Sequence, residues 1–151
     1  MSIWFKDYTT DKHGSMEMTG LNKLIGIKIT EIGDDYLKGT MPVDDRTKQP
    51  VGLLHGGANC VLAETLASMG AYLVIDPSKN NAVGIEINAN HIRSAKEGEV
   101  TGTARPIHLG KQTHVWQVEV TRDDGKLSCV SRVTMAVFMQ CLSWQKRQEH
   151  Y

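Results

Sequence analysis

The stretch that decides the fold is residues 53–75, which read LLHGGANCVLAETLASMGAYLVI. Glu64 is the only Asp, Glu, Lys or Arg in it. A membrane span is one interpretation of such a length, but glycines, an asparagine and a serine interrupt the run and nothing else in the chain is membrane-like. The stretch therefore predicts one long helix that is buried on most of its sides.

Strand-like patterns lie on both sides of this helix. Before it, isoleucines at 25, 27 and 29 alternate with polar or small residues, and a second alternating run covers 37–43. After it, turn-forming residues at 76–81 end the apolar stretch. Four further strands are then expected at 82–94, 99–108, 112–122 and 127–138.

This order of elements predicts an α+β fold in which an antiparallel sheet of about six strands wraps around one central helix. In the run 112–122, Trp116, Val118 and Val120 share one face, and polar residues occupy the other. One such sheet covers only part of the helix, so a second copy of the chain is expected to bury the rest together with the sheet edge. We expect a single domain over residues 1–138 and a polar tail at 139–151.

The composition excludes several classes of protein. The chain has 151 residues, and its 17 Lys plus Arg balance 17 Asp plus Glu. Zero net charge gives no general attraction to nucleic acid, and no basic run is longer than Lys146-Arg147. The three cysteines have no CxxC spacing, and His13, His114 and His150 have no metal-ligand spacing. These features predict no metal centre and, with no signal peptide at the start, a cytoplasmic protein.

Glu64 is the strongest candidate for chemistry. At 100° per residue, one broad apolar face of the helix contains Leu54, Ala58, Val61, Leu62, Thr65, Met69, Tyr72 and Leu73. Glu64 lies beside that face, in a stripe with Cys60, Ala67, Ser68 and Ala71. A carboxylate among small and apolar groups should have a raised pKa and be reactive. The structural alternative is a carboxylate that bonds a neighbouring backbone group or an arginine across an interface.

The start of the helix is a second candidate site. His55-Gly56-Gly57 follows a Pro- and Gly-containing loop, so free backbone N–H groups should face outward and stabilise a phosphate or an oxyanion. A tight helix entry beside a solvated histidine is the alternative. Glu64 lies about 12 Å further along the helix, too far to share one reacting carbon within a chain. A dimer with antiparallel helices would place the helix start of one chain near Glu64 of the other.

Two other runs carry basic residues next to turns. Residues 86–94 end a strand with His91 and Arg93, and residues 107–112 form a Gly-containing turn with His108 and Lys111. Either run could bind phosphate through charge and backbone N–H groups, and either could be an ordinary solvated loop.

Taken together, these segments resemble the hotdog-fold acyl-CoA thioesterases. The similarity is greatest to the branch with phenylacetyl-CoA, enterobactin-pathway proofreading and 1,4-dihydroxy-2-naphthoyl-CoA thioesterases. It covers about residues 20 to 138. The matching residues are Met41–Asp44, Arg46-Thr47, Gln49-Pro50, Gly52–Ala58, Leu62–Leu66, Glu86, Asn88-Ala89, His91, Arg93, Glu97-Gly98 and His108–Gln112.

The resemblance implies hydrolysis of an acyl-CoA to free acid and CoA, without a metal or redox cofactor. The acyl group would be aromatic, such as dihydroxynaphthoyl, hydroxybenzoyl or phenylacetyl. Glu64 would attack the thioester carbon or activate a water, and the Gly56 N–H would polarise the carbonyl. His55 and Gln49 would assist there, and Ser68 would orient the carboxylate or the water. The implied CoA contacts are Gly84, His91, Ile92, Arg93, Ser94, His108, Leu109, Gly110, Lys111, Gln112 and Thr113, with Arg93 and Lys111 as phosphate partners.

The same fold offers two alternatives to hydrolysis. A module that binds acyl-CoA without turning it over would not need a carboxylate at position 64. The dehydratase branch uses a His and an acidic residue in an arrangement that this sequence lacks. The expected partners are an acyl-CoA and further copies of the chain, with a dimer as the minimal unit and a tetramer as the full assembly. The naphthoyl-CoA relatives point to menaquinone biosynthesis as one pathway.

Overall fold

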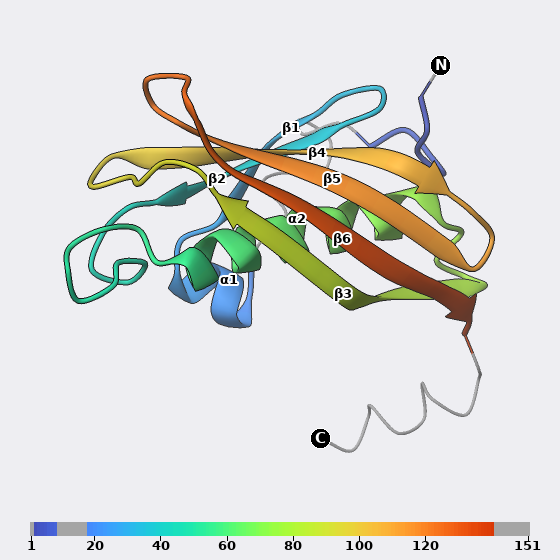
Figure 1. Cartoon of the computed structure of the whole chain (residues 1–151). Coiled ribbons are helices and arrows are strands. Elements are labelled where there is room, and N and C mark those ends of the chain that lie inside the picture. The colour runs from blue at the N-terminus through green and yellow to red at the C-terminus, as the bar shows by residue number, and fades with distance from the viewer. Residues whose placement is uncertain (1, 9–17, 141–151) are drawn as a thin grey trace.

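The computed structural model describes residues 2–8 and 18–140, which form two helices and six strands (Figure 1). The elements are α1 (Gly20–Leu24), β1 (Lys28–Ile32), β2 (Leu37–Pro42), α2 (Gly56–Val74), β3 (Asn80–His91), β4 (Glu99–Leu109), β5 (Thr113–Arg122) and β6 (Leu127–Met139). The strands form one antiparallel sheet in the order β1-β2-β4-β5-β6-β3, and α2 packs along one face of it. The expected α+β architecture is confirmed. No helix in these two ranges is long and apolar enough to cross a bilayer.

The inner face of the sheet and α2 together enclose the core. Trp116, Val118 and Val120 of β5 are fully buried, whereas Gln117 and Glu119 between them are exposed. The alternation read from this strand is therefore confirmed.

Small residues let α2 approach the sheet closely. The buried residues of α2 are Asn59, Leu62, Ala63, Leu66, Ala67, Gly70, Ala71 and Leu73. Of the apolar face read from the sequence, Leu62 and Leu73 are among them, and Ala58, Val61 and Met69 are partly buried against the core. Several small residues are buried as well, because α2 is apolar on several sides.

The opposite side of α2 is covered by the chain's N-terminal part. The Phe5 N–H donates to the Leu73 carbonyl at 2.9 Å, and the Thr65 hydroxyl donates to Oδ1 of Asn22 in α1 at 2.9 Å. Only Gly57 and Tyr72 of the helix are exposed. The prediction of a helix buried on most sides is confirmed.

Several predicted boundaries differ from the structure. The apolar stretch 53–75 becomes helical only at Gly56. The first strand is β1 at 28–32 instead of 25–29: the buried Ile25 and Ile27 precede it, and Gly26 between them has a φ of +79°, which breaks an extended run. The five-residue α1 was not predicted, because it is too short to show a period. Strand β3 starts at Asn80, within the expected breaker cluster.

The two edges of the sheet are unlike each other. Strand β1 is short, whereas β3 is long and, among the described strands, pairs only with β6. Val83 and Ile85 on β3 are 47% and 62% exposed. A long edge with exposed apolar side chains is a typical site of association with another chain. Of the expected tail at 139–151, Met139 belongs to β6 and Gln140 follows it; the rest lies outside the described residues.

Replacing Gly70 with alanine should destabilise the fold. A Cβ at this position would lie 2.8 Å from the Trp116 ring, which is also stacked against Trp4 with 6.4 Å between ring centroids. We expect Gly70→Ala to lower the free energy of unfolding by about 1 kcal/mol or more, because the overlap outweighs the better helix propensity of alanine. Chemical denaturation of both proteins measures this change. In a Trp116→Phe background the smaller ring leaves room, so the cost should shrink; an equal cost in both backgrounds would contradict the packing argument.

Candidate active site

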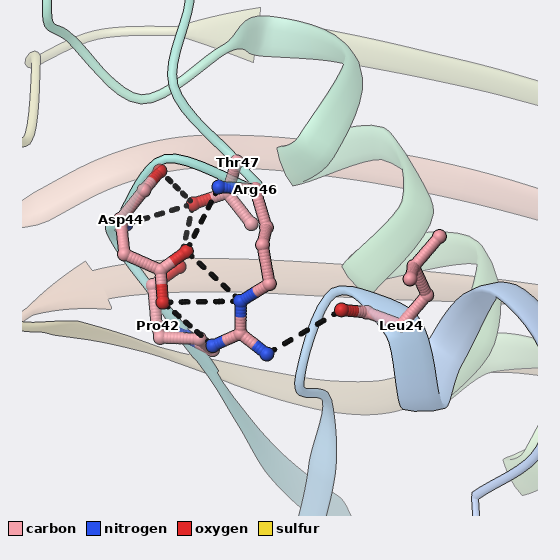
Figure 2. A network of polar contacts seen from close by, with 5 residues as sticks. All are labelled: Leu24, Pro42, Asp44, Arg46 and Thr47. Atoms are coloured by element: carbon pink, nitrogen blue, oxygen red, sulfur yellow. Dashed lines mark hydrogen bonds and ion pairs between the residues drawn. The ribbon is translucent and has the colours of Figure 1, made fainter.

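A polar network fixes the loop that leads into α2 (Figure 2). The Thr47 hydroxyl donates to the Pro42 carbonyl at 2.7 Å and accepts from the Asp44 N–H at 3.1 Å. The Arg46 guanidinium pairs with the Asp44 carboxylate at 2.6 Å and donates to the Leu24 carbonyl at the end of α1 at 3.4 Å. The loop is thereby attached both to the end of β2 and to α1.

The same loop positions the first residues of α2. The His55 N–H donates to the Thr47 carbonyl at 2.8 Å, and the Gln49 N–H donates to the Leu53 carbonyl at 2.8 Å. The His55 ring caps the helix, because its Nδ1 accepts from the Gly57 N–H at 2.8 Å. His55 therefore has a structural role at the helix start that the sequence did not reveal.

Gly56 combines a free N–H with a close contact. Among the described residues its N–H has no hydrogen-bond partner, so it remains available at the positive end of α2. Its side-chain position is filled by His91 from the end of β3: a Cβ on Gly56 would lie 2.8 Å from Nε2 of His91. A side chain at position 56 would therefore displace the His91 ring from the start of the helix.

A cavity of about 240 Å³ opens in front of this helix start. It is lined by Gln49, Leu53, Leu54, Gly56, Asn59, His91, Ile92, Arg93, Ser94, Ala95 and Ser128. The structure therefore brings together Gln49, Gly56 and the predicted run 91–94. The His55 side chain instead borders a separate depression together with Arg46 and Val61.

Glu64 lies in a second cluster, two turns along α2. The Ser68 hydroxyl is within hydrogen-bond distance of Glu64 Oε1 at 3.5 Å, as the resemblance implied. Gly84, expected to contact CoA, lies against Glu64: a Cβ there would collide with the carboxylate. Glu64 forms no ion pair within residues 2–8 and 18–140. Burial raises the pKa of Glu64, and the hydrogen bond from Ser68 opposes that rise only in part.

The predicted CoA contacts lie at two distant places. Thr113 pairs with Ala136, which also pairs with Val83, so the turn containing Lys111 lies near the Gly84 end of the sheet. Arg93 follows the opposite end of β3 and donates to the Leu127 carbonyl at 3.1 Å. The end of β4 and the turn after it contain the other predicted contacts of this run, which are His108, Leu109, Gly110 and Gln112. One protomer therefore does not join Arg93 and Lys111 into a single phosphate site.

The sequence analysis missed Asn59. Its side chain is only 4% exposed, and it lines the cavity three residues after Gly56, on the same side of the helix. A polar amide in the otherwise apolar first turns of α2 was the available signal.

Replacing Glu64 with glutamine should stabilise the protein in a pH-dependent way. A carboxyl whose pKa is raised by folding favours the folded state fully below its unfolded pKa, here near 4.5, and loses that contribution as the pH rises through its folded pKa. Because glutamine does not titrate, the gain in unfolding free energy of Glu64→Gln over the native chain should grow as the pH rises above about 4.5. Denaturant titrations across this range measure the gain. A gain that stays constant with pH would show that Glu64 is not desolvated.

Comparison with known proteins identifies the family. The Thioesterase superfamily profile matches residues 51–129. A 1,4-dihydroxy-2-naphthoyl-CoA hydrolase of Escherichia coli is 47% identical over 135 residues, which are 89% of this chain and 98% of the relative. A proofreading thioesterase, EntH, of Cronobacter turicensis is 43% identical with the same two coverages.

Solved structures show the same architecture. A crystal structure of a variant of the thioesterase PA1618 from Pseudomonas aeruginosa superposes with a TM-score of 0.88 at 46% identity, covering 92% of this chain and 100% of that one. The thioesterase HI1161 of Haemophilus influenzae gives a TM-score of 0.85 at 40% identity, covering 91% and 95%. With its six-stranded sheet, its central helix and these relatives, the chain belongs to the thioesterase superfamily and is a thioester hydrolase of the hotdog fold.

Proposed function

We propose that this protein hydrolyses an aromatic acyl-CoA to the free acid and CoA, with Glu64 as the reacting carboxylate and the Gly56 N–H as the group that polarises the carbonyl. The observation that carries the proposal is the half-buried Glu64, which forms no ion pair with the described residues, on the same helix that starts with an N–H that has no partner among them. The aromatic class is supported by the 1,4-dihydroxy-2-naphthoyl-CoA hydrolase among the relatives. No metal or other cofactor is needed for this chemistry.

The proposed reaction needs one carboxylate and one oxyanion donor. In the general-base form, Glu64 takes a proton from water, whose oxygen adds to the thioester carbon while the Gly56 N–H stabilises the oxyanion. In the nucleophilic form, the carboxylate oxygen itself adds to that carbon and water hydrolyses the resulting anhydride. In both forms the C–S bond breaks and the CoA thiolate leaves and takes up a proton.

We further propose that each site is shared by two protomers. The Gly56 N–H and Glu64 of one chain are separated by eight residues, or about 12 Å along α2, so they cannot act on one carbon together. Glu64 lies against Gly84, and Gly56 against His91, which is seven residues further along the exposed β3 edge. Antiparallel pairing of two β3 edges, centred on Asn88, would place the β-bulge at Gly84 and Ile85 of one protomer opposite His91 of the other.

The same pairing offers a single binding region for CoA. In one protomer Arg93 and the Lys111 turn lie at opposite ends of β3. Across the proposed pairing, Arg93 of one protomer approaches the end of β3 that neighbours the Lys111 turn of the other. The two cations would then flank one diphosphate, and the exposed Val83 and Ile85 would be covered.

Replacing Glu64 with glutamine should abolish most of the activity. Glutamine keeps the shape of the side chain but can neither accept a proton nor attack a carbonyl, so we expect kcat to fall by about 10²- to 10⁴-fold. Release of free thiol from a panel of aromatic and straight-chain acyl-CoAs measures the rate. Glu119→Gln, on the exposed face of β5, is the matched control and should be as active as the native chain. Equal rates for Glu64→Gln and the native protein would remove Glu64 from the reaction, and inertness of the native protein toward the whole panel would refute the proposed substrate class.

A mixture of two inactive variants should regain activity if the site is shared. Gly56→Pro removes the N–H that would polarise the carbonyl, at the first residue of α2, where proline is tolerated, and Glu64→Gln removes the carboxylate. After the two chains are unfolded and refolded together, mixed dimers contain one site with both native residues, so about a quarter of the native activity should return. Each variant refolded alone is the control. If Gly56 and Glu64 served the same site within one chain, the mixture would stay as inactive as its components.

A further inference from the structure

We infer that Asn59 is a positioning residue that fixes the proton of His91 on Nε2, so that His91 presents a second N–H donor beside the Gly56 N–H. The inference deepens the proposed function and depends on it for its chemical meaning. The observation behind the inference is the buried side-chain amide of Asn59.

Asn59 is buried without the partners that a buried amide normally has. Its side chain is 4% exposed, and its Oδ1 has no hydrogen-bond partner among the described residues. Buried polar atoms are nearly always paired, because leaving one unpaired costs free energy. The single polar contact of the side chain is from Nδ2 to Nδ1 of His91, at 3.5 Å. The amide therefore serves no other hydrogen bond in this part of the fold.

In the inferred arrangement, the contact with Asn59 sets the tautomer of His91. An amide nitrogen can only donate a hydrogen bond, so Nδ1 of His91 must accept and cannot carry a proton in the neutral ring. The proton of the imidazole is then on Nε2. The tautomer of a histidine is commonly set in this way by the partner of its other nitrogen.

The Nε2–H group lies where a second donor would act. Nε2 is the atom of His91 nearest to the point where a Cβ on Gly56 would lie. Both residues line the 240 Å³ cavity. Two N–H groups, one from the backbone and one from the ring, thus flank the place where the thioester carbonyl would enter. His91 would act on the carbonyl oxygen, whereas the resemblance implied a contact with CoA. Oxyanion sites commonly use such pairs of donors, because each added donor stabilises the transition state.

The Asn59→Asp variant reverses the hydrogen bond and is the decisive substitution. A carboxylate of the same length only accepts, so it should draw the His91 proton to Nδ1 and leave Nε2 without its N–H. Long-range ¹H–¹⁵N spectra of the ligand-free protein report the tautomer, with the His91 signals assigned by their loss in His91→Gln. We expect Nε2–H in the native protein and Nδ1–H in Asn59→Asp. Thiol release should show kcat lowered by about 10²-fold with KM little changed, because the lost donor acts on the developing oxyanion.

Two controls separate positioning from a general effect of charge or folding. Asn90→Asp puts the same charge next to His91 in sequence, but on the opposite face of β3, and should keep both the Nε2–H tautomer and the native kcat. In a His91→Gln background, Asn59→Asp should lower kcat no further, because Asn59 acts through His91.

The outcomes distinguish this inference from the proposed function. An Nδ1–H tautomer in the native protein would overturn the inference, whether or not Asn59→Asp folds. So would an equal additional loss of kcat in the His91→Gln background. Since the spectra need no substrate, the tautomer result stands even if the native protein hydrolyses no acyl-CoA, a failure that would refute the proposed function alone.

Discussion

Close packing of α2 on the sheet is the constraint on which the rest of the structure depends. Ala63, Ala67 and Gly70 bring the helix backbone near the strands, and the N-terminal part of the chain covers its other side. A helix enclosed in this way has little room for charge, so its one carboxylate, Glu64, must lie at the border of the core, against the edge strand β3. The packing that stabilises the fold thus also raises the pKa of Glu64 and directs it toward the edge where a second chain could bind.

The sequence predicted those parts of the fold that depend on patterns along the chain. Six strands and one long buried helix follow from alternation and from length, and a single charge in an apolar run marks Glu64 as a candidate for chemistry. Which small residues of α2 meet the sheet could not be predicted, because the helix is apolar on more than one side. His91 contacts Gly56, which is 35 positions away in the sequence. Local sequence patterns cannot predict a contact between residues so far apart in the chain.

The two histidines of the site illustrate this limit. His55 adjoins the two glycines in sequence, and the resemblance implied that it assists at the carbonyl; in the structure its Nδ1 accepts from the Gly57 N–H. His91 comes from another element, and its ring occupies the side-chain position of Gly56. The start of a helix can be predicted from the sequence. Which strand lies against that start depends on the topology of the sheet.

The position of the N–H donors explains why a shared site suits this fold. Gly56 and His91 meet at one end of β3, while Glu64 and Gly84 meet seven residues away on the same edge. A rigid helix cannot shorten that separation, and a sheet strand cannot bend across it without losing the ladder to β6. The proposed two-fold pairing of the edges would remove the conflict, because an antiparallel partner would present its own Gly84 end where the first chain presents His91. Association would then complete the chemistry without any change in the fold of either chain.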